Sequence, residues 1–288
     1  MSLIEIKNVN KSFGSLEVLK NISFNIEKNT IVGILGPNGS GKSTLMRIIS
    51  GLIKTWKGDI CFYGDSIRLN NYYLHSTGFL IEDPAFYEHL TAIENLNLLA
   101  RLSKTPAWRV NQALKRVDLD KSLNKKVSQF SYGMKQRLGI AQAILNDADI
   151  LFLDEPNNGL DPNGMIQMNK TITDLNKLGK TICISTHILE DVKELCSHII
   201  ILKDGELILD NSIENLLMNT KKYVIKSKNS KNVESTLSKI KNLKIIEKTD
   251  KKIVINSSLK IQEIIQLIPH DVDIFSINKE PDIENLFL

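Results

Sequence analysis

The segment that most constrains the fold is "GPNGSGKST", residues 36–44, which follows the apolar run "TIVGILG" and precedes the helically spaced "KSTLMRIISGLI". It fits the pattern G-x-x-x-x-G-K-[ST] in the strand-then-helix context that this pattern requires. Its three glycines let successive backbone N–H groups face one anion, and the helix that follows adds its positive dipole end. A glycine turn before a core helix would not also require lysine followed by serine. The sequence therefore predicts a nucleotide-binding P-loop domain.

An acidic pair ends a second apolar run, "ILFLDEP", residues 150–156. Four apolar residues predict a buried strand, and Asp154 at its end is placed to hold the hydration shell of Mg²⁺. Glu155 follows directly and is placed to orient an attacking water. In the phosphate loop we expect Lys42 to reach the β- and γ-phosphates and the Ser43 hydroxyl to bind the metal. The loop residues expected to contact the nucleotide are Gly36, Pro37, Asn38, Gly39, Ser40, Gly41, Lys42, Ser43 and Thr44.

The order of apolar runs predicts an α/β fold. The first 30 residues alternate apolar and polar side chains between short turns, which indicates antiparallel strands. Residues from about 85 to 145 have mostly helical spacing. The later elements are expected to be strands at 149–155, 180–186 and 198–209, separated by helices at 162–177 and 188–196. This alternation around a helical insertion predicts a mainly parallel sheet with a helical subdomain.

The composition changes near "MNTKK", residues 218–222, and no glycine follows. From there the pattern predicts strand, helix, strand, strand, helix and strand, which is the ferredoxin-like order. We therefore expect an ATPase domain at 1–218, with its helical subdomain at about 85–145, and a small α+β domain of unknown role at 219–288. The expected elements of the small domain are strands at 222–227, 242–249, 252–256 and 272–278 and helices at 231–240 and 260–268.

Bulk properties indicate a cytoplasmic protein. No apolar run approaches the roughly 18–20 residues that span a bilayer, and the first residues lack the layout of a signal peptide. Cys61, Cys183 and Cys196 lie far apart in the sequence, which favours a reducing compartment over a disulfide scaffold or a zinc site. The formal charge of +4 is carried by residues after 220. A weakly basic tail can favour an anionic membrane surface or nucleic acid, but an excess this small is explained more simply by a solvated lysine-rich surface. We expect no nucleic-acid partner.

The segment "QFSYGMKQRLGIAQAIL", residues 129–145, resembles the signature region of the ATP-binding-cassette (ABC) ATPases, and the resemblance extends from residue 1 to about 215. The family's LSGGQ is replaced by "FSYGM", with Tyr132 in place of the first glycine. The resemblance implies that Ser131 and Gly133 contact a γ-phosphate held by the opposite subunit, in line with the preference of a helix N-terminus for anions. It also implies an ABC cassette with a mainly parallel core sheet, an antiparallel N-terminal β subdomain and a helical signature subdomain.

Three further positions match the family in its order. "NNGLDP", residues 157–162, resembles the D-loop and implies that Asp161 lies at the contact between subunits. His187 ends the strand of "CISTHILEDV" and matches the switch histidine that senses the γ-phosphate. Phe13 in "KSFG" matches the aromatic residue that stacks on adenine, and a flat π face is all that stacking requires. A core phenylalanine is the rival interpretation of Phe13.

Glu82 stands 40 residues after Lys42, where the family usually has the Q-loop glutamine. The surrounding "FLIEDPAFYEHLTAIENL" resembles the variant in lantibiotic-immunity and bacitracin-resistance transporters. Glutamate can ligate Mg²⁺ and accept hydrogen bonds from water, but it cannot donate the amide N–H bond of glutamine. We therefore predict Glu82 as a catalytic and metal-binding residue. Asp83 is expected to face solvent. A polar loop before a helix capped by Thr91 and Glu94 is a compatible, simpler interpretation.

The resemblance implies an ATP-hydrolysing subunit that works with separate membrane permeases and forms a head-to-tail homodimer with two composite sites. It would lie in the cytoplasm, bound to the inner face of the membrane through the permeases. The subfamily implies export of, or resistance to, a peptide antibiotic. Phe86, Tyr87 and Leu90 are candidates for the groove that receives a permease, and a core role for them is an equal alternative. The alternative function is a soluble ABC-type ATPase, such as one that assembles Fe–S clusters.

Overall fold

The computed structural model describes residues 2–228, 230–238, 240, 243–268, 274–281, 283 and 286. The chain divides into two compact units, one ending at Asn211 and the other beginning at Ser212. Helix α7 (Ile213–Asn219), which the sequence did not predict, belongs to the second unit, and the boundary expected between residues 218 and 219 falls within it. Each unit has its own sheets and its own buried core.

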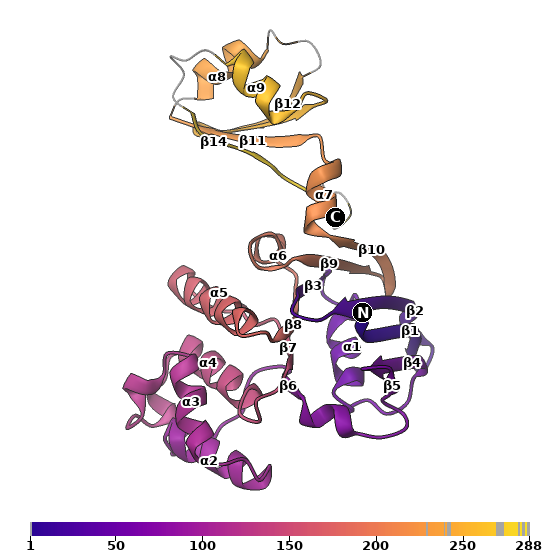
Figure 1. Ribbon diagram of the computed structural model, residues 1–288, viewed down its shortest axis with the longest axis vertical. Helices are drawn as coiled ribbons and strands as arrows, with labels where there is room; N and C mark the ends of the chain where they lie inside the picture. Colours follow the sequence, from indigo (N-terminus) through magenta and orange to yellow (C-terminus); the bar gives the residue numbers. More distant parts are fainter. Residues whose placement is uncertain are drawn as a thin grey trace. The chain divides into compact units, whose positions relative to one another are not determined.

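An antiparallel sheet forms the N-terminal part of the first unit (Figure 1). Its strands, in the order β2-β1-β4-β5, are β2 (Leu16–Glu27), β1 (Ser2–Phe13), β4 (Lys57–Phe62) and β5 (Asp65–Ser66). Along β2, buried Ile22, Phe24 and Ile26 alternate with exposed polar residues, as a strand with one solvated face requires. The predicted antiparallel N-terminal subdomain is confirmed, but β4 and β5 were not predicted.

The central sheet is mainly parallel. Its strands, in the order β10-β9-β3-β8-β7-β6, are β10 (Glu206–Ser212), β9 (His198–Lys203), β3 (Ile31–Leu35), β8 (Thr181–Thr186), β7 (Ile150–Asp154) and β6 (Thr77–Leu80). The pairs from β9 to β6 are parallel, so the carboxyl ends of β3, β7 and β8 meet at one edge. Every residue of these three strands is buried, which explains why they read as continuous apolar runs.

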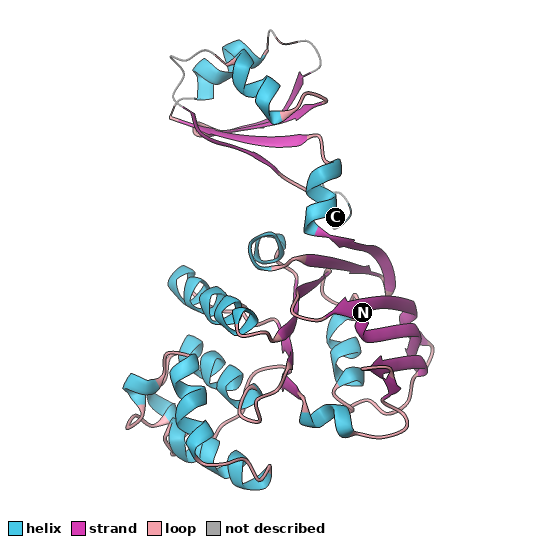
Figure 2. Ribbon diagram, viewed as in Figure 1, coloured by secondary structure: helices cyan, strands magenta, loops and turns pink. Residues whose placement is uncertain are grey.

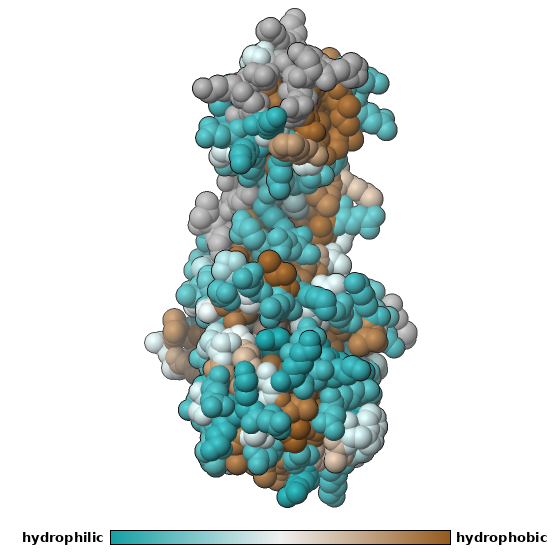
Figure 3. Space-filling view, turned by 90° about the vertical axis from the view of Figure 1, so that its left-hand side faces the viewer, coloured by the Kyte–Doolittle hydropathy of each residue, from teal (hydrophilic) through white to brown (hydrophobic). Residues whose placement is uncertain are grey.

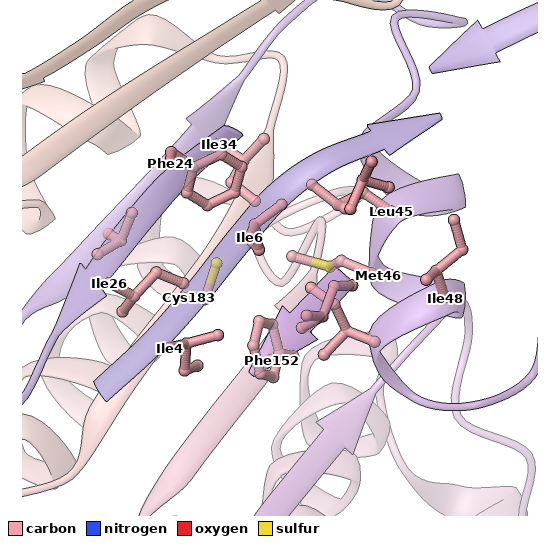
Figure 4. Close-up of a cluster of buried hydrophobic side chains, with 14 of the residues drawn as sticks. Ile4, Ile6, Phe24, Ile26, Ile34, Leu45, Met46, Ile48, Phe152 and Cys183 are labelled. Atoms are coloured by element: carbon pink, nitrogen blue, oxygen red, sulfur yellow. The ribbon is translucent and has the colours of Figure 1, made fainter. Parts of the chain in front are cut away.

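Helix α1 (Lys42–Ile49) lies between the two sheets, and α5 (Pro162–Lys177) and α6 (Leu189–Leu195) cover the other face of the central sheet (Figures 1 and 2). Figure 4 shows Met46 of α1 between Ile6 of the antiparallel sheet and Phe152 of the central sheet. All three side chains are fully buried. Burying a large apolar side chain stabilises a fold by about 1.5–3 kcal/mol, so this cluster holds the phosphate-loop helix in place.

A group of helices follows β6 in the chain. It comprises α2 (Ala92–Leu102), α3 (Trp108–Arg116) and α4 (Tyr132–Ala143), and it forms the predicted helical subdomain (Figure 2). Thr91 caps α2: its Oγ1 accepts from the Glu94 backbone N–H at 3.3 Å, and the Glu94 carboxylate accepts from the Thr91 N–H at 2.7 Å. The predicted capping box is therefore confirmed.

The second unit is a small α+β fold. After α7 it contains β11 (Lys222–Ser227), α8 (Ser230–Leu237), β12 (Leu243–Lys248), β13 (Lys252–Ser257), α9 (Ile261–Leu267) and β14 (Ile274–Lys279). The strands form an antiparallel sheet in the order β12-β13-β11-β14, which is the ferredoxin-like arrangement. The predicted bounds at residues 242 and 272 lie outside the described residues. The predicted fold class, a cassette with a small C-terminal α+β fold, is confirmed.

Hydrophilic residues are interspersed with smaller hydrophobic patches on the face shown in Figure 3. In the part of the chain that the structure describes, no helix combines the length and the apolar character needed to cross a membrane.

Candidate active site

The phosphate loop connects the end of β3 to the start of α1, and its backbone requires glycine. Gly39 and Gly41 have φ values of +84° and +104°, in the left-handed region that favours glycine. A Cβ at Gly41 would lie 2.6 Å from the Leu19 side chain, and one at Gly36 would lie 2.3 Å from the Leu202 carbonyl oxygen. No side chain caps the N-terminus of α1, and its first turn has no acidic residue. The loop therefore presents backbone N–H groups and a positive dipole end to an anion.

Lys42 begins α1 and turns back into the loop. Its side chain is only 4% exposed, and its Nζ donates to the carbonyl oxygens of Gly36 at 2.7 Å and Pro37 at 3.1 Å. Burial lowers the pKa of Lys42, while the nearby charges of Glu155 and Asp154 act in the opposite direction. The ammonium group is thus held at the mouth of the loop.

Glu155 occupies a constrained position just beyond β7. Its φ of +49° is left-handed, and its backbone N–H donates to both the carbonyl oxygen and the Oγ of Ser185, each at 3.1 Å. The Ser185 Oγ in turn donates to Oδ1 of Asp154. Ser185 is fully buried, so a single hydroxyl on β8 fixes both acidic residues. Sequence reasoning did not single out Ser185, although a serine inside the apolar strand "TICIST" was the available signal.

His187 and Lys42 approach the Glu155 carboxylate from two directions. His187 Nδ1 lies 2.8 Å from one Glu155 oxygen, and Lys42 Nζ lies 3.8 Å from the other. The Nδ1–H tautomer of His187 donates in this contact. The structure therefore brings together three of the predicted catalytic residues, from the start of α1 and from just beyond the ends of β7 and β8.

The residues around this edge fit a nucleotide phosphate and Mg²⁺. Ser40 Oγ is buried and has no hydrogen-bond partner among the described residues, and the space around Gly39 is open. The Ser43 side chain is partly exposed, and Asp154 is 8% exposed. A hydroxyl and a carboxylate are oxygen ligands of the kind that Mg²⁺ prefers. Of the remaining loop residues, Asn38 is exposed, and Pro37 and Thr44 are partly exposed.

A second group of predicted residues lies at the starts of α4 and α5. Ser131 is the N-cap of α4 and accepts from the Met134 N–H at 3.3 Å. Asp161 is the N-cap of α5 and accepts from the Gly164 N–H at 3.0 Å. Together with Gly133 they line a cavity of about 390 Å³. Within the described residues, no hydrogen bond or ion pair joins this group to Lys42 or Glu155.

Glu82 and Asp83 have different partners from those that the sequence indicated. Glu82 has a φ of +65°, and its carboxylate forms an ion pair with Arg47 of α1; no hydrogen bond joins it to Asp154 within the described residues. Asp83 is exposed, as predicted, but Oδ1 accepts a hydrogen bond from the Tyr132 hydroxyl at 2.6 Å. This partner could not be predicted from the sequence, because it is 49 residues away along the chain.

Phe13 is accessible. Its side chain is 51% exposed, and Lys11 Nζ lies 4.5 Å from the ring centroid. The interpretation of Phe13 as a core residue is therefore wrong, since half of its side chain is exposed although Lys11 lies over the ring. Tyr87 is 61% exposed, whereas Phe86 and Leu90 are partly buried.

Comparison with known proteins identifies the family. A family model described as ABC transporter matches residues 19–158. The chain is 37% identical over 212 residues to the lantibiotic transport ATP-binding protein SrtF of Streptococcus pyogenes, covering 74% of this chain and 92% of SrtF. It is 38% identical over 224 residues to the bacitracin transport ATP-binding protein BcrA of Enterococcus faecalis, covering 77% of this chain and 73% of BcrA.

A solved structure shares the fold. The ATP-binding cassette MJ0796, in a dimeric post-hydrolysis state bound to ADP and Pi, is similar with a TM-score of 0.65 and 29% identity. The match covers 73% of this chain and 98% of that cassette. The parallel sheet with its phosphate loop, the helical subdomain and these similarities agree, and the predicted family is confirmed. The chain belongs to the ATP-binding proteins of the ABC transporter family.

Proposed function

We propose that this chain is the ATP-hydrolysing subunit of a transporter that works with separate membrane permeases and exports, or protects against, a peptide antibiotic such as a lantibiotic or bacitracin. The observation that most directly supports ATP hydrolysis is that the Glu155 carboxylate is held between Lys42 and His187. The antibiotic class is supported by the similarity to SrtF and BcrA. These relatives do not favour the alternative of a soluble Fe–S assembly ATPase.

In the proposed reaction, Mg²⁺ supplies charge neutralisation on the transferred phosphoryl group. Lys42 would exchange its two carbonyl partners for phosphate oxygens, and Ser43 and Asp154 would hold the metal. Glu155 accepts a hydrogen bond from the attacking water, and His187 orients Glu155 and senses the γ-phosphate. Positioning and electrostatics supply most of the rate enhancement in phosphoryl transfer, which suits a site whose groups are fixed by backbone and serine contacts.

We infer that two copies of the chain assemble head to tail. Ser131, Gly133 and Asp161 lie at helix starts apart from Lys42, so one chain supplies the phosphate loop and the other the signature helix. This chain carries both halves of the composite site, which supports a homodimer, as does its similarity to a dimeric cassette. ATP then joins the subunits, and hydrolysis lets them part, which is a ligand-driven population shift.

The proposed location is the cytoplasmic face of the membrane, through the permeases. Exposed Tyr87 and the partly buried Phe86 and Leu90 follow Glu82 directly and are candidates for the permease groove. A growth test with lantibiotics and bacitracin examines the substrate class. Cells that carry the chain and its permeases should tolerate at least one of them better than cells that carry a Glu155→Gln chain, and equal sensitivity would contradict the antibiotic assignment.

The direct test of hydrolysis is Glu155→Gln. We expect this variant to lose ATP turnover and to accumulate as an ATP-bound dimer in gel filtration, because the amide retains the shape of the side chain but not its charge. Glu214→Gln, an identical change on the exposed side of α7, is the matched control and should behave as wild type. Normal turnover in Glu155→Gln would refute the assignment.

The metal role of Glu82 has its own test. Because Glu82 pairs with Arg47, we infer that the carboxylate leaves this pair when Mg²⁺ and ATP bind. Glu82→Gln should then change the Mg²⁺ concentration needed for half-maximal ATPase activity. An unchanged Mg²⁺ dependence would remove Glu82 from the metal site.

A further inference from the structure

Tyr132, at the position of the first glycine of the family's signature, makes a contact that glycine could not make. Its hydroxyl donates to Asp83 Oδ1 at 2.6 Å, and Gln136 Nε2 donates to the same hydroxyl oxygen at 2.8 Å. Burial and the hydrogen bond to Asp83 raise the pKa of Tyr132, so the hydroxyl remains a donor at neutral pH. The signature helix α4 is thus bonded to the loop between β6 and α2.

The position of this hydroxyl is fixed from several sides. Gln136 is 3% exposed, so the amide that supports the hydroxyl is itself held in the interior. A Cβ at Gly159 would lie 3.0 Å from Cε1 of the Tyr132 ring, which shows that the ring packs against the loop that leads to Asp161. The link is therefore a packed arrangement and not a chance surface contact.

Other contacts fasten the same loop to α4. Lys135 and Glu88 form an ion pair at 2.6 Å. A Cβ at Gly139 would lie 2.7 Å from the Leu80 side chain and 3.1 Å from that of Pro84, so the helix packs closely on the loop. Just ahead of α4, the N–H groups of residues 127 and 128 donate to the carbonyl oxygens of residues 90 and 88, each at 2.9 Å. The segment after Glu82 and the start of α4 are therefore joined by an ion pair, close packing and backbone hydrogen bonds.

Glu82, the residue before Asp83, bonds to the phosphate-loop helix α1 and not to α4. Glu82 pairs with Arg47, which lies one helical turn after Ser43 in the phosphate-loop helix. Two consecutive carboxylates thus connect the helix that begins at the phosphate loop to the helix that begins at the signature. The Glu82 backbone has a φ of +65°, and the side chain of the next residue, Asp83, is bonded to Tyr132. A change of partner that shifts the Glu82 backbone therefore also shifts the residue that holds the Tyr132 hydroxyl.

We propose that Tyr132 is a positioning residue that transmits the engagement of Glu82 at the nucleotide to the N-terminus of the signature helix. Through Asp83, the hydroxyl holds the α4 start and its cap Ser131 in the orientation that a second copy of the chain requires. This inference rests on the proposed function, because it assumes that ATP bound at the phosphate loop joins two copies of the chain. Tyr132 itself is not a catalytic residue in this scheme.

The experiment separates ATP binding by one chain from ATP-driven pairing of two chains. In the full-length Glu155→Gln chain, ATP binding is measured at low protein concentration with a fluorescent ATP analogue, and dimer formation by analytical ultracentrifugation. Tyr132→Phe and Asp83→Ala should leave binding by the single chain unchanged and raise the ATP concentration for half-maximal dimerisation about 5- to 10-fold. The double variant should dimerise no more weakly than Tyr132→Phe alone, because Tyr132→Phe already removes the hydroxyl that bonds to Asp83.

Two controls distinguish positioning from general damage. Asp83→Asn keeps an oxygen that accepts from Tyr132 and should retain most of the dimerisation. Tyr72→Phe removes the same hydroxyl from a side chain that is 76% exposed and should have no effect. Additive effects in the double variant, weaker ATP binding by the single chain, or equal loss in Tyr72→Phe would each overturn the proposal.

Failure of the proposed function gives a different result. If the parent Glu155→Gln chain does not dimerise with ATP, the proposed function with two composite sites is wrong, and the positioning role of Tyr132 is wrong as well. If the parent dimerises and the Tyr132 and Asp83 variants behave identically to it, only the positioning role is wrong.

Discussion

Replacing Ser185 by alanine tests how the acidic pair is held. The Ser185 Oγ makes two contacts: it donates to Asp154 Oδ1 and accepts from the Glu155 N–H at 3.1 Å. The Glu155 N–H keeps its second acceptor, the Ser185 carbonyl oxygen at 3.1 Å. The Asp154 carboxylate, only 8% exposed, loses a donor that water cannot readily replace.

The expected magnitude follows from these contacts. A hydrogen bond to a charged group contributes about 1.5–3 kcal/mol, and the retained backbone bond limits the loss at Glu155. We therefore expect Ser185→Ala to lower the free energy of unfolding by about 2 kcal/mol, measured by urea denaturation. Since Glu155 also loses part of its anchoring, kcat for ATP should fall about 10-fold, equivalent to about 1.4 kcal/mol in the activation barrier.

Ser197→Ala is the matched control. The Ser197 Oγ donates at 3.2 Å to the carbonyl oxygen of Ile31 and contacts neither acidic residue. Its side chain is exposed, so we expect a stability loss below about 1 kcal/mol and an unchanged kcat. If Ser185→Ala is no more damaging than Ser197→Ala in both assays, the reasoning that one buried hydroxyl fixes the acidic pair is refuted.

Three further changes test the scaffold. Gly41→Ala should lower the free energy of unfolding by about 2–4 kcal/mol, because strain at φ +104° adds to a clash with backbone and side-chain atoms. Gly64→Ala is the control: its φ is +90°, but the space around it is open, so it should cost only about 1–2 kcal/mol. Equal losses of the two variants in thermal denaturation would contradict this reasoning. Thr91→Ala removes the α2 cap and should cost about 1 kcal/mol in the same assay, and no change would discount the cap. Burial raises the pKa of Asp147, but hydrogen bonds and charges of its basic neighbours, including nearly buried Lys180, outweigh it and lower that pKa. The stabilisation is therefore present at neutral pH and lost as pH falls through the lowered pKa. Because the Asp147 side chain is 46% exposed, solvent screens these pairs, and Asp147→Asn should cost about 0.5–1 kcal/mol at pH 7. This difference should shrink below about pH 4 in urea titrations, and its persistence there would contradict the assignment.

The sequence predicts the elements of the central sheet well, because β3, β7 and β8 are buried on both faces and read as unbroken apolar runs. The carboxyl ends of parallel strands share an edge, and Lys42, Glu155 and His187 approach one another there. The sequence indicated His187 only through its resemblance to the ABC family and not through the order of the elements. The four-residue strand β6 was missed, since so short a segment carries no periodicity.

Side-chain partners are less accessible to sequence reasoning. Periodicity assigns a residue to a face of a helix or strand but does not name what packs on that face. Tyr132 and Asp83 meet only because α4 lies on the loop after β6, and Glu82 meets Arg47 only because that loop runs beside α1. Ser185 was overlooked for a related reason: a buried serine in an apolar strand gives no indication of which atom it contacts.

The bonds of Lys42 have a consequence for the thermodynamics of ATP binding. Its ammonium group donates to the Gly36 and Pro37 carbonyl oxygens, so the lysine side chain and the backbone of the loop hold each other in place. The contribution of Lys42 to affinity is then the difference between two sets of hydrogen bonds, not the full strength of the new set. In return, little conformational entropy is lost on binding, because the backbone of the loop is already ordered. Calorimetry should therefore report a modest enthalpy with a small entropic penalty, the pattern of a preorganised receptor.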